Sequence, residues 1–466
     1  MQNKIKTLIK DTFIFAIGSF GSKLILFLLV PLYTNYLSKE QYGTADLVIT
    51  VSQLIIPVIS IDIFSAVIRF GLEKDQKKED VLLNSFLILA FSCAMSIVLQ
   101  PLFSIIQPIK QWRRYLSIYS IAMVGMSIEM NYLKVKDKNK LFALMSLLQA
   151  LFLGALNYLF LTKWNLNIQG YLLSNCISCV LIFVILLIFG GIIKDLRKGH
   201  YNKELLRKML VFSAPLIIND ISWWGIHSTD KMMIEGMINL SELGLYTLAS
   251  KIPSLMNVLI TIFTQAWGLS SIREIETSRN TRFFSTIFSA FSMLAFGAAI
   301  LINCFIKPFM SIYVAEEYQE AWKLVPILLV SASFSAVAAY YGSVYSAIKK
   351  TMGCMWTTII AGVLNVALNY IFIRQYGVWG ALIGTVVSYI VLAVARMINI
   401  RKHIIIQTDY VRFSLNSALA IIHAIFIIRD DKPFIISVIT LLVFLIVNFP
   451  SLKRVIQHNH TKEPNT

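Results

Sequence analysis

The chain consists of long apolar runs separated by short polar connections. An α-helix needs roughly 20 apolar residues to cross about 30 Å of hydrocarbon. A transmembrane β-barrel would instead show alternating segments of about ten residues, so these runs predict helices, which satisfy their own backbone hydrogen bonds. The pattern therefore predicts fourteen transmembrane helices. Their approximate limits are 12–35, 44–67, 81–104, 115–133, 141–162, 168–192, 209–229, 242–267, 283–305, 323–348, 355–373, 378–398, 411–428 and 433–450.

One heptapeptide occurs almost twice in the chain. Residues 155–161 read ALNYLFL, and residues 367–373, 212 positions later, read ALNYIFI. Each copy lies inside a predicted helix, and a glycine opens the apolar run that follows it. This echo predicts a tandem duplication with six helices in each half. Because six is an even number, both halves enter the membrane from the same side, as in transporters built from parallel repeats.

The predicted fold class is an all-α polytopic membrane protein of about 14 transmembrane helices, with two parallel six-helix lobes around a central cavity. The last two helices have no counterpart in either half, so they form an addition to a twelve-helix core. The predicted segments are an N-terminal lobe at 1–192, a cytoplasmic linker at 193–208, a C-terminal lobe at 209–402, two additional transmembrane helices at 403–452 and a cytoplasmic tail at 453–466.

Composition and charge agree with a lipid solvent. Hydrophobic residues make up 57% of the chain, charged residues 14%, and the mean hydropathy is +0.70, whereas a soluble domain carries about 25% charged residues. With the N-terminus inside, 29 of the 42 Lys and Arg residues lie in predicted cytoplasmic stretches and 11 in outer loops. The positive-inside rule therefore places both termini in the cytoplasm. The net charge of +17 reflects topology and contact with anionic membrane lipid, and nothing indicates nucleic-acid binding.

The sequence shows no motif for catalysis, a metal or a nucleotide. Its six His residues are scattered, and none is paired at the spacing of a zinc site. Cys176 and Cys179 form a C-x-x-C inside a predicted membrane helix, where we expect packing and not redox chemistry. Residues 18–23 (GSFGSK) lack the spacing of a phosphate loop. We therefore expect no cofactor, no metal and no enzymatic activity.

Two lysines lie at membrane depth in predicted helices. Lys23 is near the centre of span 1, with Thr12 and Ser19 on its face, and Lys251 lies in span 8. A charge at mid-bilayer costs at least about 2.5–3.5 kcal/mol, so each lysine is a candidate for a hydrated cavity. The alternative is that each long side chain extends to the headgroups. That alternative fits Lys251 better, because Lys251 is nearer the outer end of its span.

Span 7 carries a polar stripe. Asp220, Trp224, His227 and Lys231 follow one another at i, i+4, i+7 and i+11, and Asp230 lies beside them. Carboxylates and an indole ring together suit a sugar, because hydroxyls need acceptors and pyranose faces stack on aromatic rings. An interfacial Trp with ion pairs along the helix would explain the same stripe.

Span 2 carries a second polar face, followed by ionisable residues toward the cytoplasm. Pro57 should loosen the backbone of this helix. Beyond it, Asp62 and Arg69 are seven residues apart, and Glu129 of span 4 lies at a similar depth. Arg69 is either a positive charge that fixes the membrane topology or a residue that binds the substrate. The polar face of span 2 comprises Asp46, Thr50, Gln53, Pro57 and Ser60. The candidate binding residues are Lys23, Lys251, Asp220, Trp224, His227, Asp230, Lys231 and Arg69.

Two stretches resemble a known transporter family. Residues 228–231 (STDK) followed by 240–252 (LSELGLYTLASKI) are similar to the span 7 to 8 signature of polysaccharide transporters of the multidrug/oligosaccharidyl-lipid/polysaccharide exporter superfamily. Residues 31–33 (PLY) and 37–43 (LSKEQYG) resemble the first loop of the same branch. The resemblance covers essentially residues 10–400, including the helix count and the parallel duplication.

The resemblance implies a function as well as a fold. Wzx-type O-antigen flippases of this branch move undecaprenyl-diphosphate-linked oligosaccharides from the inner to the outer leaflet of the bacterial inner membrane. Related lipid II flippases carry cations in spans 1 and 8, and Lys23 and Lys251 match those places. Lysine stands where arginine is common, which puts a bidentate contact with the diphosphate in doubt.

The resemblance also implies alternating access between the two halves, and leaves several partners and rivals open. A proton or sodium gradient, or consumption of the product outside by a polymerase or export complex, would bias the exchange outward. A cation-coupled drug antiporter of the same superfamily is one rival. A membrane-embedded polysaccharide polymerase is another, although the longest outer connection, residues 306–322, is short for such an enzyme.

Overall fold

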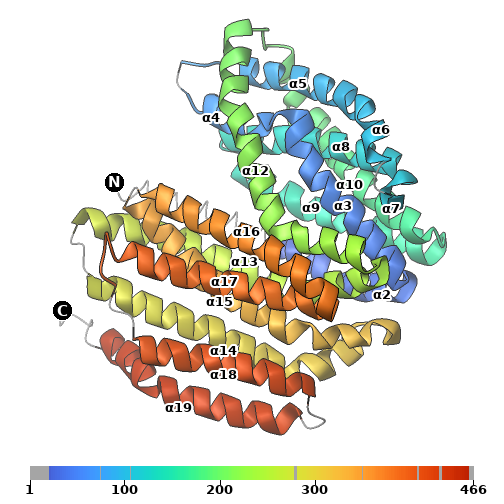
Figure 1. Ribbon diagram of the computed structural model, residues 1–466. Helices are drawn as coiled ribbons and strands as arrows, with labels where there is room; N and C mark the ends of the chain where they lie inside the picture. The colour runs from blue at the N-terminus through green and yellow to red at the C-terminus, as the bar shows by residue number, and fades with distance from the viewer. Residues whose placement is uncertain are drawn as a thin grey trace. The chain divides into compact units, whose positions relative to one another are not determined.

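The structure is a computed structural model that describes residues 20–73, 75–104, 107–277, 281–348, 350–406, 409–429 and 433–460. Within these ranges all regular secondary structure is helical. The chain forms two compact units, Met1–Met232 and Met233–Thr466 (Figure 1). The all-α membrane fold predicted from the sequence is thereby confirmed, whereas the limits of the two lobes stay a prediction.

The first unit is built around one central helix, α8, which packs against α3, α4, α5 and α10. Small residues allow this packing: Gly125 of α8 lies where a Cβ would approach the Phe183 ring of α10 at 2.9 Å. Residues 20–28 are also helical. The helices of this unit are α2 (Val30–Tyr36), α3 (Lys39–Ser60), α4 (Ile63–Gly71), α5 (Lys78–Val98), α6 (Gln100–Phe103), α7 (Gln107–Lys110), α8 (Arg113–Val135), α9 (Asn139–Tyr158), the π-helix η1 (Leu159–Lys163), α10 (Asn167–Phe189), α11 (Ile192–Leu196) and most of α12 (Lys203–Met237).

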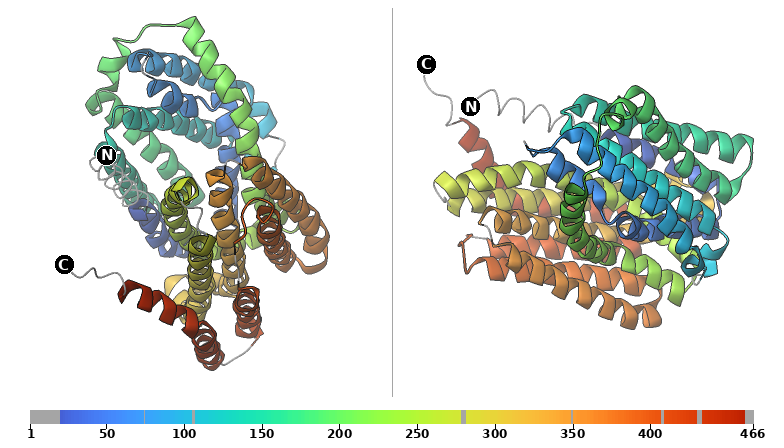
Figure 2. Two further views of the ribbon diagram at one scale, coloured as in Figure 1. Left: turned by 90° about the vertical axis from the view of Figure 1, so that its left-hand side faces the viewer. Right: turned by 90° about the horizontal axis from the view of Figure 1, so that it is seen from above.

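The second unit is built around α15, which packs against α13, α14, α17 and α18. Its helices lie side by side, with α18 and α19 next to α14 at one edge (Figures 1 and 2). The helix α15 is the fourth predicted span of its half, as α8 is of the first half. The helices of this unit are α13 (Leu240–Thr277), α14 (Thr281–Tyr313), the 3-10 helix η2 (Glu316–Lys323), α15 (Val325–Ala347), α16 (Thr351–Tyr376), α17 (Val378–Ile400), α18 (Tyr410–Arg429) and α19 (Pro433–His460).

Ten helices within the described residues are long and apolar enough to cross a membrane. The other four predicted spans correspond to residues 12–35, to α8, to the polar α12, and to α19, whose apolar part is Ile435–Phe449. Large apolar side chains face outward at the helix ends; Phe189 is 82% exposed and Ile312 is 89% exposed. Such a surface suits lipid, because in water it would be costly.

The repeated heptapeptide occupies corresponding positions in the two units. Asn157 in α9 and Asn369 in α16 are both fully buried. After each copy, a glycine of the following helix meets the phenylalanine of the motif: a Cβ at Gly170 would lie 3.0 Å from the Phe160 Cβ, and a Cβ at Gly380 would overlap the carbonyl of Phe372. Both glycines therefore permit close approach of a helix to the one before it.

The predicted cytoplasmic linker begins with a segment that is docked on the first unit. The Lys136 Nζ, just after α8, lies 3.0 Å from Glu79 of α5 and 3.1 Å from Asp195 of α11. The Tyr132 hydroxyl donates to the same Asp195 carboxylate at 3.1 Å. Further along, the backbone amide of His200 donates to Asp80 at 2.8 Å. These contacts join α5, α8 and the start of the linker at one end of the bundle.

Candidate substrate-binding site

The polar faces predicted for spans 2 and 7 meet inside the first unit. The Lys231 ammonium of α12 donates to the Asp46 carboxylate of α3 at 2.7 Å. The side chains are 20% and 10% exposed, so both charges are largely removed from solvent. Because the desolvation of two charges costs several kcal/mol per ion, such a pair persists only when its geometry is good. The contact therefore joins the two helices at one defined register.

A second polar contact lies farther along the same two helices. The Trp224 indole Nε1 donates to the backbone carbonyl of Thr50 at 2.8 Å. Trp224 remains half-buried, so part of its ring stays accessible, and its orientation is held by the hydrogen bond. An aromatic ring fixed in this way can stack on the apolar face of a sugar.

At its C-terminal end, α3 breaks before α4 begins. Ile61 and Asp62 adopt left-handed backbone conformations with φ of 51° and 47°, which are costly for residues other than glycine. The Asp62 side chain is 1% exposed, and its Oδ1 accepts no hydrogen bond from the described residues. Asp220 of α12 is near enough for its charge to repel that of Asp62. We call the two contacts, Asp46 with Lys231 and Thr50 with Trp224, together with the carboxylates of Asp62 and Asp220, the α3–α12 polar strip.

The remaining predicted site residues lie outside this strip. Lys23, in the helical residues 20–28, is exposed, and Lys251 of α13 is half-buried. Neither lysine lies within 4.0 Å of a carboxylate of the described residues. Arg69 is 57% exposed and pairs with Glu73 at 2.9 Å, the geometry of a surface pair. Asp230 is buried at 5% exposure, and the side chain of His227 lies outside the described residues.

The sequence analysis did not identify one buried cation, Arg396. Arg396 of α17 is 6% exposed, donates to the Ala338 carbonyl at 2.6 Å and to the Thr358 hydroxyl at 2.7 Å, and so links α15, α16 and α17. Arg396 is not among the binding residues that the sequence analysis predicts. The signal that could have identified it is its place inside an apolar run, five residues before Arg401.

Glu129 of α8 has a distinct environment. Its side chain is fully buried, and neither carboxylate oxygen has a hydrogen-bond partner among the described residues. The sequence placed Glu129 at the depth of Asp62 and Arg69, and only the structure adds that it lies in the core of the first unit.

One family profile matches more than half of the chain. The family profile described as "Polysaccharide biosynthesis protein" matches residues 8–268. No curated protein matches the chain.

Solved structures share the fold at low sequence identity. The lipid II flippase MurJ, in an inward closed conformation, superposes with a TM-score of 0.73 at 15% identity, covering 94% of this chain and 99% of that chain. An inward-facing multidrug resistance MATE family transporter of the MOP superfamily gives a TM-score of 0.61 at 17% identity, covering 84% and 94%. A MOP superfamily transporter from Pyrococcus furiosus gives 0.58 at 16% identity, covering 85% and 96%. These likenesses show the fold.

Proposed function

The chain belongs to the polysaccharide biosynthesis protein family and has the fold of MOP superfamily transporters, and from this premise we propose that it is a flippase for lipid-linked oligosaccharides. Its cargo is an undecaprenyl-diphosphate-linked repeat unit for an O-antigen, capsular or exopolysaccharide. The protein moves this unit from the cytoplasmic to the outer leaflet of the bacterial inner membrane by alternating access, without a catalytic step.

The observation that carries this proposal is the α3–α12 polar strip. Ionisable residues are costly at membrane depth and usually line a hydrated path for cargo or ions. Here Asp46, Lys231 and the fixed Trp224 ring lie together on two helices of one unit. Carboxylate, ammonium and indole groups are the chemistry that binds sugar hydroxyls and pyranose faces. The strip is therefore assigned to the saccharide part of the cargo.

Lys23 and Lys251 are assigned to the diphosphate. No carboxylate of the described residues neutralises either ammonium group, so each charge remains available to an anion. One cation at about 4 Å from one phosphate charge is worth about 4 kcal/mol at an effective dielectric constant of about 20. Loss of either cation should therefore reduce transport much more than it reduces folding.

The test is complementation of a flippase-null bacterial strain, with surface glycan scored beside membrane abundance. We expect Lys23→Ala and Lys251→Ala each to lower surface glycan at near-normal abundance, Lys23→Arg to retain most activity, and Lys23→Glu to be worse than alanine because it adds repulsion. Lys208→Ala is the matched control, since Lys208 is 54% exposed and pairs with Glu204 outside the strip. Full activity of the double variant Lys23→Glu, Lys251→Glu would show that neither lysine binds the diphosphate.

A small-molecule antiporter is the second candidate. Two observations favour it: MATE transporters share the fold, and acidic side chains such as Asp46 and Asp62 suit organic cations. Expression in an efflux-deficient strain separates the two functions. A flippase should restore glycan export without raising drug tolerance, whereas an antiporter should do the reverse.

A further inference from the structure

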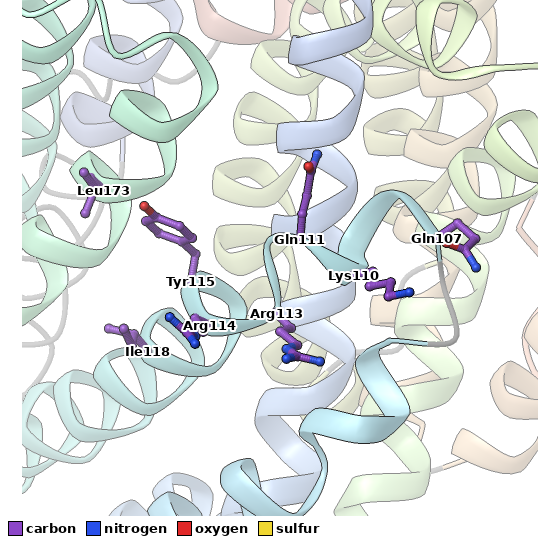
Figure 3. A pocket seen from close by; sticks show the side chains of 8 residues that line it. All are labelled: Gln107, Lys110, Gln111, Arg113, Arg114, Tyr115, Ile118 and Leu173. Atoms are coloured by element: carbon purple, nitrogen blue, oxygen red, sulfur yellow. The ribbon is translucent and has the colours of Figure 1, made fainter.

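A basic pocket opens at the first turn of α8, away from the α3–α12 polar strip (Figure 3). Its volume is about 920 Å³. Three of the eight side chains that line it are cationic, and none is acidic. The lining residues are Gln107, Lys110, Gln111, Arg113, Arg114, Tyr115, Ile118 and Leu173.

The cations of this pocket are available to a ligand. Lys110 and Arg114 are exposed, and within the described part of the chain neither lies within 4.0 Å of a carboxylate. To the residues that the structure describes, Arg113 donates one hydrogen bond, from Nη1 to the Ser104 hydroxyl at 3.0 Å, which orients the guanidinium. The N-terminal end of the α8 dipole adds further positive potential. The pocket is therefore suited to an anion with several oxygens.

The pocket is held by buried neighbours. Ile109 of α7 is fully buried and Trp112 is 8% exposed, so the segment between α7 and α8 is anchored on both sides of Gln111. The Trp112 and Tyr115 rings lie 5.8 Å apart. In Figure 3 the Tyr115 ring points toward Leu173 of α10, while Lys110 and Gln107 lie on the other side of the pocket. The buried residues Ile109 and Trp112 therefore hold the backbone segment that carries the cations.

The wall of the pocket changes from polar to apolar along α8. The polar lining residues end at Tyr115, and the next lining residue on this helix, Ile118, is 53% exposed. Leu173 adds a second apolar side chain. Because α8 enters the predicted membrane span here, the cations lie at headgroup depth and the apolar residues lie toward the hydrocarbon. A phosphate that carries a long apolar chain matches both parts of this wall.

We propose that this pocket binds a lipid-borne phosphate, with the phosphate oxygens on Lys110, Arg113 and Arg114 and the first part of the chain along Ile118 and Leu173. Two membrane lipids offer this chemistry: a polyprenyl diphosphate and an anionic phospholipid headgroup. The inference requires only that the chain is a membrane protein, and it does not depend on what the protein transports. In the predicted orientation the pocket faces the outer leaflet, where three basic residues in one loop run against the positive-inside rule.

The experiment measures lipid binding to the full-length protein purified in detergent, by native mass spectrometry or by ligand-induced thermal stabilisation. The probes are undecaprenyl diphosphate, phosphatidylglycerol, phosphatidylcholine and inorganic pyrophosphate. The test variant is Lys110→Gln with Arg114→Gln, which removes two exposed charges and should fold normally. The matched control is Lys163→Gln with Lys323→Gln, which removes the same net charge elsewhere.

We expect at least one of the two anionic lipids to bind the natural protein and the control variant, and to bind the test variant about tenfold more weakly, because two cations are lost. The lipid that shows this loss identifies the source of the phosphate. Phosphatidylcholine should bind weakly to all three proteins. Equal binding of every lipid to the test and control variants would overturn the proposal. Binding of pyrophosphate as tight as that of the lipids would also overturn it, because the apolar wall would then contribute nothing.

Discussion

At the scale of single residues, the Asp46–Lys231 pair shows why a polar strip can exist at membrane depth. The two charges are 2.7 Å apart and each is mostly buried. Their attraction offsets the cost of desolvation only while both are present. The pair is therefore tolerated only as a whole, and removal of either charge alone should destabilise the fold.

This pair gives a prediction of stability. Lys231→Met removes the ammonium group from the largely buried Asp46 carboxylate, and we expect a loss of about 3–5 kcal/mol in the free energy of unfolding. Asp46→Asn combined with Lys231→Met removes both charges and should recover most of the loss. Thermal unfolding of the purified variants in detergent measures both effects. If Lys231 acted only on cargo, the single variant would unfold at the temperature of the natural protein.

The strip also shows how much of the site the sequence could predict. Helical periodicity identified which residues share a face of span 2 and which share a face of span 7, because that depends only on spacing. It could not show that Asp46 faces Lys231, since the two residues are 185 positions apart in the sequence and their helices meet through packing. Arg396 was missed for a related reason: its partners, Ala338 and Thr358, lie on two other helices.

At the scale of helices, glycines decide how closely neighbours approach. Only Gly377 separates α16 from α17, and it has a φ of 58°. A few residues later, Gly380 lies where a Cβ would overlap the carbonyl of Phe372. Backbone atoms cannot rotate away as a side chain can, so the contact between α16 and α17 requires glycine at this position.

We therefore predict that Gly380→Ala lowers the free energy of unfolding by about 1–3 kcal/mol. Gly268→Ala is the matched control, because a Cβ at Gly268 in α13 would meet no described atom within 4 Å. The control should be neutral or should stabilise the protein by up to about 1 kcal/mol, as alanine favours helix more than glycine does. Thermal unfolding distinguishes them. Equal stability of the two variants would contradict the close contact with Phe372.

One lysine, Lys136, joins α5, the end of α8 and the start of the predicted linker. Burial lowers the pKa of the Lys136 ammonium, but its hydrogen bonds and charge interactions with Glu79 and Asp195 outweigh this effect and hold the pKa above its ordinary value. A raised lysine pKa contributes stability that is complete below the unfolded value and is lost only as pH rises through the folded value. This contribution should therefore be constant across neutral pH.

We predict that Lys136→Gln destabilises the protein by about 1–2 kcal/mol, because two carboxylates lose a charged donor. The loss should be the same at pH 6 and pH 8. Lys198→Gln is the control, since Lys198 is an exposed lysine of the same linker. Thermal unfolding at the two pH values measures the effect. A variant as stable as the control would show that the docked segment is held by other contacts.

At the scale of the whole molecule, the sequence was most informative about class and least informative about helix limits. Apolar length and composition sufficed for an all-helical membrane protein, because the bilayer imposes that solution on any such chain. The predicted span 7 ended at residue 229, whereas α12 continues to Met237. Within this polar extension Lys231 has a partner on α3, Asp46, which the apolar pattern could not reveal.

Orientation is a property of the whole chain, because it follows from the sum of its basic residues. The division of 29 to 11 predicts that the linker is cytoplasmic and that the loop before α8 is outside. With the five natural cysteines replaced, a membrane-impermeant maleimide applied to intact cells should label Gln111→Cys and leave Asn202→Cys unlabelled. Both should react once the membrane is opened, which shows that each site is accessible. The reverse pattern would show that the protein has the opposite orientation. The basic pocket at the start of α8 would then face the cytoplasmic leaflet, where its three cations would simply follow the positive-inside rule.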